Sequence, residues 1–198
     1  MSAPEKYHRI NIWEYLGQEN SSDIEELQRV ISGFTCPRNP DVERFLKTSA
    51  VDFTRKSQSV TYLALSNEGS ELLGYFSIAV KPLTIRTDRI SRTFAKRLER
   101  VSKLDEAAQT YTTAAYLIAQ LGKNYTDGAN EKISGSDLLK LAWDVVKTLQ
   151  RLAGGVVAFV EAEEHEKLLD FYQRNHFWIS DKRASDSGDL VQLIRIIK

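Results

Sequence analysis

The residues at positions 133–137, Ile-Ser-Gly-Ser-Asp, have types and a position suited to binding an anion. They follow an apolar run at 115–121 and precede Leu138 and Leu139, which begin a helix-patterned stretch. A turn of small residues that opens a helix directs several backbone N–H groups toward one point beside the positive end of the helix dipole. We therefore predict that this turn, called the anion cradle below, binds a phosphate or pyrophosphate group. The alternative is an ordinary helix cap without a ligand.

Groups able to move protons cluster further along the chain. Glu161 and Glu163 lie at or just past the end of a predicted strand at 156–160, where ligand crevices form in sheets of this kind. His165 has a near-neutral reference pKa and could do the same work. We take Glu161 as the candidate general base, and the alternative for each of these groups is a solvated or capping side chain.

Other reactive groups are sparse. The three histidines, His8, His165 and His176, have no ligand spacing, and no paired carboxylates suggest a metal, so we predict no metal site. Cys36 is the single cysteine, which excludes an internal disulfide and fits a reducing compartment. An unpaired cysteine of this kind usually behaves as a small apolar side chain.

The sequence pattern of the N-terminal third predicts two helices followed by a β-hairpin. One helix is expected over 23–31 with Ser21 or Ser22 as its cap, and a second begins at the Asn-Pro-Asp sequence at 39–41. Strands are expected at 60–65 and 72–80, joined by a turn at 67–70, and Pro82 should end the second strand.

The second half predicts alternating strands and helices. A strand at 114–121 leads to the anion cradle, and a helix at 136–153 ends at Gly154 and Gly155, which can adopt the left-handed conformation. The apolar strand at 156–160, a helix at 164–174 and two closing strands follow. The strand-helix-strand unit should be parallel and right-handed. We predict a single α/β (α+β) domain over 1–198, with a mixed sheet flanked by helices.

The segment at 81–103, called the basic segment below, is unusually charged. It carries eight basic and two acidic residues, a net charge of +6 in a chain whose total is zero. A helix is expected over 88–103, inside an insertion at about 84–112, because Ile90, Phe94, Leu98 and Val101 recur at helical spacing. Its cations predict an anionic partner, a tRNA or an acidic protein surface. The alternatives are a solvated helix face and a dimer contact. The cations we assign to that partner are Arg89, Arg92, Lys96 and Arg100.

Composition sets broad limits on the class of protein. A chain of 198 residues fits one domain with a real core, and its 27 basic and 27 acidic residues give no global reason to expect nucleic acid or membrane. Residues 1–6 lack a targeting pattern, and no window reaches about 18 apolar residues. We expect a cytoplasmic protein without a membrane segment, either monomer or homodimer.

Four segments together resemble the GNAT (GCN5-related N-acetyltransferase) family. They are the strand at 116–119, the turn at 133–135, the strand at 156–161 and the sequence at 167–177. The family's cradle reads Gln/Arg-x-x-Gly-x-Gly/Ala, and here Asn130, Ile133 and Gly135 stand at its three defined positions. In the family's Phe-Tyr-x-x-x-Gly-Phe pattern, His176 replaces Gly, while the preceding Asn175 can adopt the left-handed conformation.

The resemblance implies an N-acetyltransferase that moves acetyl from acetyl-CoA to an amine by direct attack. The acceptor amine is not specified. The long connection at 122–130 contains four residues that can reshape the cradle loop, Lys123, Asn124, Asp127 and Gly128. Tyr172 matches the tyrosine that protonates the departing thiolate, and the alternative is aromatic core packing. The implied acetyl-CoA or CoA contacts are Leu117, Ile118, Ala119, Leu121, Lys132, Ile133, Ser134, Gly135, Ser136 and Asp137. An alternative function is a noncatalytic CoA-sensing module, or an RNA- or protein-binding module that uses the basic segment.

Overall fold

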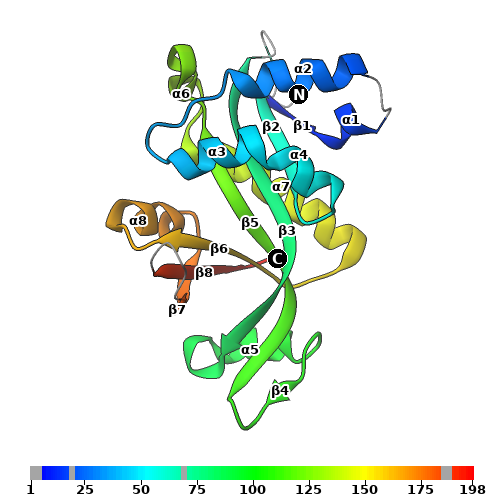
Figure 1. Cartoon of the computed structure of the whole chain (residues 1–198). Coiled ribbons are helices and arrows are strands. Elements are labelled where there is room, and N and C mark those ends of the chain that lie inside the picture. The colour runs from blue at the N-terminus through cyan, green and yellow to red at the C-terminus, as the bar shows by residue number, and fades with distance from the viewer. Residues whose placement is uncertain (1–5, 18–20, 68–70, 184–188) are drawn as a thin grey trace, which may run out of the picture. The chain divides into compact units, whose positions relative to one another are not determined.

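A computed structural model of the chain describes residues 6–17, 21–67, 71–183 and 189–198. Figure 1 draws the whole chain, which divides into two compact units. The N-terminal unit comprises Met1–Ala79 and Ala119–Asp144, and the C-terminal unit comprises Val80–Ile118 and Val145–Lys198. Two strands and one helix, β3, β5 and α7, contribute residues to both units. The predicted one-domain organisation stays a prediction.

Antiparallel strands and short helices form the N-terminal unit. Strand β1 (Tyr7–Asn11) pairs with β2 (Val60–Ser66), and β2 pairs with β3 (Leu72–Arg86). The helices are α1 (Trp13–Leu16), α2 (Ser21–Ser32), α3 (Pro40–Thr48) and α4 (Ala50–Arg55). Asn39 caps α3 as predicted, because its side chain accepts hydrogen bonds from two backbone N–H groups of the first turn. Most of the predicted turn at 67–70, the side chain of Ser21 and residues 1–5 lie outside the described part of the chain.

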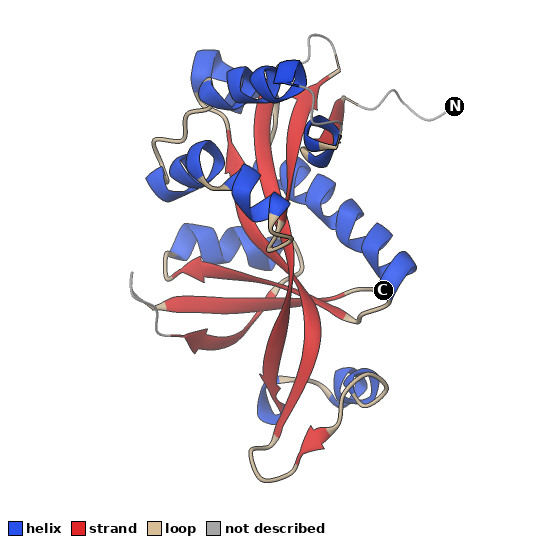
Figure 2. Cartoon of the chain, turned by 45° about the vertical axis from the view of Figure 1, so that its right-hand side comes forward, coloured by secondary structure: helices blue, strands red, loops and turns tan. Residues whose placement is uncertain are grey.

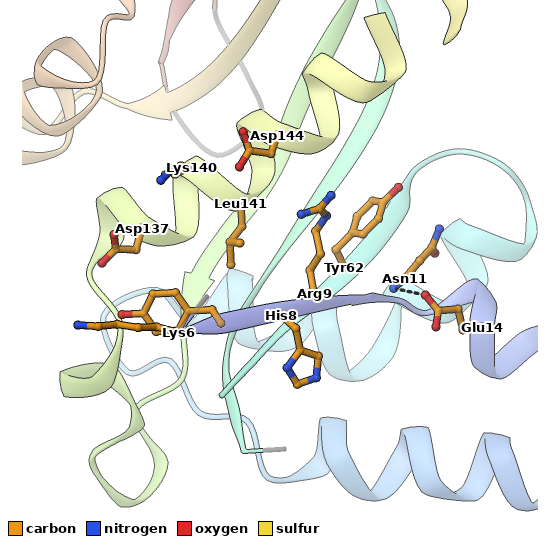
Figure 3. A pocket seen from close by; sticks show the side chains of 11 residues that line it. Lys6, His8, Arg9, Asn11, Glu14, Tyr62, Asp137, Lys140, Leu141 and Asp144 are labelled. Atoms are coloured by element: carbon orange, nitrogen blue, oxygen red, sulfur yellow. Dashed lines mark hydrogen bonds between the residues drawn. The ribbon is translucent and has the colours of Figure 1, made fainter. Parts of the chain in front are cut away.

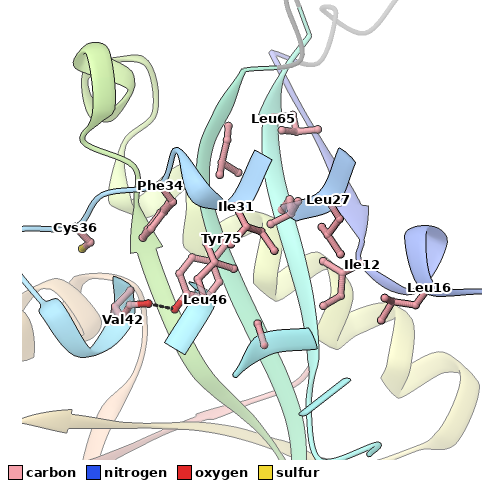
Figure 4. Close-up of a cluster of buried hydrophobic side chains, with 13 residues drawn as sticks. Ile12, Leu16, Leu27, Ile31, Phe34, Cys36, Val42, Leu46, Leu65 and Tyr75 are labelled. Carbon is pink, nitrogen blue, oxygen red and sulfur yellow. Dashed lines mark hydrogen bonds between the residues drawn. The ribbon is translucent and has the colours of Figure 1, made fainter. Parts of the chain in front are cut away.

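The core of the N-terminal unit lies between its strands and helices (Figure 4). Tyr75 is fully buried there and stands edge-on to Phe34, with ring centroids 5.2 Å apart. Its hydroxyl donates to the carbonyl of Val42 at 2.6 Å, so α3 is tied to β3. Burial raises the pKa of Tyr75, which keeps the hydroxyl protonated as a donor.

The C-terminal unit contains the rest of the sheet. Its strands and helices are β4 (Leu104–Asp105), β5 (Thr110–Lys123), β6 (Val157–Glu163), β7 (Trp178–Arg183), β8 (Leu190–Ile196), α5 (Arg92–Leu98) and α8 (Glu166–Arg174). Along the sheet the strands follow the order β1-β2-β3-β5-β6-β8-β7, with β4 paired to β5. Helix α7 (Gly135–Ala153) joins β5 to β6.

The predicted mixed sheet is confirmed. Strand β5 runs parallel to β6, with Tyr116 opposite Ala158 and Leu117 opposite Phe159, whereas β6–β8 and β7–β8 are antiparallel. Gly154 and Gly155 end α7 at φ values of +81° and +99°, as predicted. Tyr116 also donates its hydroxyl to the carbonyl of Gly154 at 2.7 Å, which fixes this turn against β5.

Two predictions about the elements were wrong, and one strand was missed. Pro82 does not end a strand, because β3 continues to Arg86 and Lys81 and Pro82 lie exposed within it. The helix expected over 88–103 is only Arg92–Leu98, preceded by a 3-10 turn at Thr87–Arg89. Strand β1 was not predicted, since its five residues are all intermediate or exposed and show no apolar alternation.

A fourth difference concerns the turn after α8. His176, at φ 67°, takes the left-handed conformation that we expected of Asn175, whose φ is −95°. His176 therefore adopts a left-handed conformation at the position where the family pattern has glycine, the residue that adopts it most readily.

The basic segment is built into the C-terminal unit. Strands β3 and β5 are long and lie side by side (Figure 2). Helix α5 packs near the last residues of β3 and the first residues of β5. Phe94 of α5 is 1% exposed and meets the Trp178 ring edge-on at 5.7 Å. Leu98, fully buried, belongs to the same cluster as Leu83 and Tyr111. The apolar face of α5 is thus part of the core of this unit.

Candidate functional site

The turn predicted as an anion cradle forms a capped helix start, which the alternative, an ordinary helix cap, also predicts. Ser134 Oγ accepts a hydrogen bond from the backbone N–H of Asp137 at 3.0 Å and donates to Asp137 Oδ2 at 2.7 Å. This pair defines the first turn of α7 and places a carboxylate near its positive end, a stabilising position. The same carboxylate adds negative charge to a turn that would hold an anion.

Side chains hold the carbonyl groups of the loop before the cradle. Lys123 Nζ donates to the carbonyls of Asn130 at 2.7 Å and Ile133 at 3.2 Å. The Tyr7 hydroxyl donates to the carbonyl of Lys132 at 3.0 Å, and Lys132 Nζ pairs with Glu71 Oε2 at 2.7 Å. The loop is therefore fixed by residues of β1, of β5 and of the segment just before β3.

Backbone N–H groups of the cradle are available to a ligand. Among the described residues, no acceptor is assigned to the N–H groups of Ser134 and Gly135. The Ile133 side chain is only 1% exposed, so it lies in the interior. An isoleucine at this motif position is compatible with a cradle because its side chain points into the protein.

The Asn124 side chain makes three hydrogen bonds where the loop leaves β5. Asn124 is 5% exposed and donates from Nδ2 to the Leu72 carbonyl at 2.8 Å. Its Oδ1 accepts from the backbone N–H groups of Thr35 at 3.0 Å and Thr126 at 3.1 Å. Buried amides with this many partners specify one loop conformation. The sequence marked Lys123 and Asn124 only as residues able to reshape the loop, and Tyr7 was missed because β1 was missed.

The predicted cofactor residues of β5 occupy nearby strand positions with different exposure. Ile118 is 3% exposed, Leu117 and Leu121 are half-buried, and Ala119 is exposed. Leu117 and Ile118 fall in the C-terminal unit, and Ala119 and Leu121 fall in the N-terminal unit.

Tyr172 lies on α8 among aromatic rings. It is 8% exposed and contacts Phe171 at a centroid distance of 5.0 Å and Phe177 at 5.7 Å. No hydrogen bond to another described residue is assigned to its hydroxyl. Burial raises the pKa of Tyr172 to about 12, so the hydroxyl carries its proton at any physiological pH.

The candidate bases belong to β6 and the turn after it. Glu161 and Glu163 lie within β6, which is three residues longer than the predicted strand at its C-terminal end, rather than beyond its end. Glu161 Oε1 accepts from Arg183 of β7 at 3.3 Å, and its side chain is 19% exposed. His165 is exposed and precedes the first turn of α8 without a side-chain cap bond. Glu161 is thus the most enclosed of the three.

The four cations assigned to an anionic partner are exposed on the basic segment. Arg89 ends the 3-10 turn, Arg92 and Lys96 belong to α5, and Arg100 follows it. None of the four belongs to an ion pair within the described residues, whereas Arg86 pairs with Asp88 at 2.7 Å. Their charges are available to solvent or to a partner.

A cavity of about 600 Å³ lies against β1 and the first half of α7, within the N-terminal unit (Figure 3). Its lining mixes three cations with three carboxylates around Tyr62 and Leu141. This balanced charge selects no anion, and we assign no ligand to it. The charged residues are Lys6, Arg9, Lys140, Glu14, Asp137 and Asp144.

Within the described residues no three His, Cys, Asp or Glu side chains gather as a metal site would need. None of the helices in that part of the chain has the length and apolarity to cross a membrane.

Comparison with known proteins identifies the fold. No protein-family model and no curated protein sequence matches the chain. A solved structure of a Tyr-to-Phe mutant of KacT is 18% identical with a TM-score of 0.61, covering 95% of this chain and 94% of that one. AtaT complexed with acetyl-methionyl-tRNAfMet is 17% identical with a TM-score of 0.61, covering 93% of each chain. A mutant AtaT toxin bound to the C-terminus of the antitoxin AtaR and acetyl-CoA is 16% identical with a TM-score of 0.60, covering 97% and 94%.

AtaT and KacT have the GNAT acetyltransferase fold, and the likeness extends over nearly the whole chain. The chain therefore has the GNAT fold, as the sequence resemblance predicted. At identities of 15% to 18% the likeness concerns the arrangement of the backbone.

Proposed function

We propose that the protein is an acetyl-CoA-dependent N-acetyltransferase. The observation that carries this proposal is the anion cradle at the start of α7, in a chain with the GNAT fold. The N–H groups of Ser134 and Gly135 in this cradle have no hydrogen-bond acceptor among the described residues. The neighbour AtaT has been solved with acetyl-CoA, which supports the same ligand here.

The residues present fit coenzyme A. A pyrophosphate needs N–H donors and positive charge, and the cradle offers the N–H groups of Ser134 and Gly135 and the positive end of the helix dipole. The remaining cofactor contacts proposed from the resemblance are Lys132, Ile133, Ser136 and Asp137 at the cradle and Leu117, Ile118, Ala119 and Leu121 on β5. When bound, acetyl-CoA supplies an acetyl group on a thioester.

Tyr172 and Glu161 are the residues that we propose move protons. Tyr172 holds a proton on an oxygen without a hydrogen-bond partner among the described residues, and it can donate that proton to a departing thiolate. Glu161 can accept a proton from the acceptor amine, and Arg183 contacts its carboxylate at 3.3 Å. Backbone N–H groups of β5 would orient the thioester carbonyl.

We propose that the acceptor amine is carried by an anionic molecule, and charged tRNA is the first candidate. The exposed cations Arg89, Arg92, Lys96 and Arg100, unpaired within the described residues, support an anionic partner. Charged tRNA fits because AtaT has been solved with acetyl-methionyl-tRNAfMet. The same cations would suit an acidic protein, which a competition experiment separates from tRNA.

The experiment is release of free thiol from acetyl-CoA in the presence of aminoacyl-tRNA, peptides, polyamines and small amines. Thiol release above the rate of spontaneous hydrolysis, with an equal amount of acetylated acceptor by mass spectrometry, supports the proposal. Binding of acetyl-CoA without thiol release for any acceptor would instead favour the noncatalytic CoA-sensing module.

A further inference from the structure

Lys123, at the end of β5, contacts the cradle loop, and the resemblance to the GNAT family gives this residue no role in binding coenzyme A. We propose that Lys123 is a positioning residue for coenzyme A, which fixes the cradle loop and contributes positive charge to pyrophosphate binding. This inference rests on the proposed function, because it concerns the same cofactor.

The contacts of Lys123 set the direction of the loop amides. Its ammonium group holds the carbonyls of Asn130 and Ile133 at 2.7 and 3.2 Å. In a planar trans peptide the carbonyl and the next N–H point in opposite directions. The N–H groups of Glu131 and Ser134 are therefore directed away from Lys123. Ser134 is one of the two cradle residues whose N–H has no assigned acceptor among the described residues.

The positions held by Lys123 are the two at which the chain departs from the family motif. Asn130 stands where Gln or Arg is usual and Ile133 where Gly is usual. Lys123 contacts both residues through their backbone, so the contact does not depend on their side chains. A lysine from the preceding strand thereby supplies a cation near a motif position that holds a neutral side chain.

The charge of Lys123 has no partner in the part of the chain that the structure describes. Its hydrogen bonds go to carbonyls, and no carboxylate lies within ion-pair distance among those residues. Burial, followed by the like charge of Arg38, lowers its pKa. The neighbouring Lys132 differs, because Glu71 balances it. An anion bound at the cradle would offset the electrostatic cost of the Lys123 charge.

This arrangement predicts a pH dependence with a definite sign. The lowered pKa of Lys123 means that the free protein loses this charge at a lower pH than an ordinary lysine does. An anion prefers the ammonium form, so coenzyme A affinity should fall as pH rises through that pKa. The other charged groups on elements around the loop include Arg38, Asp127, Glu131, Asp137 and the ion pair of Lys132 with Glu71. Above about pH 8 the phosphates of coenzyme A are already fully ionised, so they do not obscure the effect.

The experiment measures coenzyme A affinity by calorimetry for wild type, Lys123→Met, Lys123→Arg and a control. Lys123→Met should raise the Kd about tenfold or more, the effect of removing charge-assisted hydrogen bonds. Lys123→Arg keeps donors and charge and should stay within about threefold of wild type, without the alkaline loss, because arginine does not titrate. The control is Lys56→Met, which removes an exposed lysine paired with Asp52 in the same unit.

The outcomes separate the two proposals. Wild-type protein that does not bind coenzyme A contradicts the proposed function. If the wild type binds coenzyme A and Lys123→Met binds it with the same Kd, only the proposed role of Lys123 is contradicted. If Lys123→Met does not fold, the pH titrations decide, and an equal alkaline loss in wild type and Lys123→Arg overturns the inference. A raised KM for acetyl-CoA in Lys123→Met, with kcat within about twofold of wild type, supports positioning rather than catalysis.

Discussion

At the scale of single residues, Tyr172 is the residue whose chemistry is most sharply defined. Its ring packs between Phe171 and Phe177, as the alternative of aromatic core packing predicts. Its hydroxyl nevertheless has no hydrogen-bond partner among the described residues. Packing fixes the ring and leaves the proton available, so the two interpretations are compatible. A pKa of about 12 for Tyr172 means that this donor stays protonated through the assay range.

Tyr172→Phe removes only the hydroxyl. We expect kcat to fall by roughly 100-fold, the effect of removing a general acid, while coenzyme A affinity and thermal stability stay unchanged. Steady-state kinetics and calorimetry measure both quantities. Tyr111→Phe is the matched control, since it removes a hydroxyl that contacts Glu99 in the same unit. An unchanged kcat in Tyr172→Phe would remove Tyr172 from the mechanism.

At the scale of elements, the start of α7 was predictable and its surroundings were not. A serine three residues before an aspartate is a local capping signal, and the structure forms that cap. The contacts from Tyr7, Glu71 and Lys123 come from distant positions in the chain, and no local pattern records them. The resemblance indicated the order of the elements, while the loop anchors depend on tertiary contacts.

Ser134→Ala should destabilise the protein by about 1 kcal/mol, because the N–H of Asp137 loses its cap. Urea unfolding measures the free-energy change. Ser134→Thr keeps a hydroxyl and should restore most of that stability. Equal stabilities for the Ala and Thr variants would show that the cap contributes nothing.

Helix α5 shows why the basic segment was only partly predictable. Phe94 and Leu98 have the helical spacing that the sequence indicated, and both are buried. Val101 continues the same pattern but is 47% exposed, because the helix ends at Leu98. Apolar spacing alone could not distinguish a helix from the turns that follow it.

Phe94→Ala should cost about 3–5 kcal/mol, because it removes a buried ring that packs on Trp178. Arg92→Ala, at an exposed position of the same helix, should change stability by less than about 0.5 kcal/mol. Chemical unfolding of both variants checks this contrast. A small effect of Phe94→Ala would mean that α5 is not part of the core of the C-terminal unit.

At the scale of the whole molecule, a chain of zero net charge has a local excess of positive charge in the basic segment. The net charge is zero, whereas the basic segment carries +6. Its apolar face is buried and seven of its eight cations are exposed, so the core of the C-terminal unit supports a charged surface. Such a surface favours a polyanionic acceptor over a small neutral amine.

Reversing Arg89, Arg92 and Lys96 to Glu should weaken tRNA binding and flatten its dependence on salt, by about 0.7–0.9 in log–log slope for each phosphate that is no longer neutralised. Filter binding over a range of salt concentrations measures both. The control reverses Arg29, Arg55 and Lys56, which are exposed in the N-terminal unit and change the net charge equally. An equal reduction of binding in both triple variants would mean that net charge, and not the basic segment, determines binding.

The most direct test of acetyl transfer is thiol release from acetyl-CoA with charged tRNA as the acceptor. The proposed function predicts release that matches acetylated aminoacyl groups one for one and that falls roughly 100-fold in Tyr172→Phe. Thiol release no faster than spontaneous hydrolysis with every acceptor tried, from protein that binds acetyl-CoA, would contradict it.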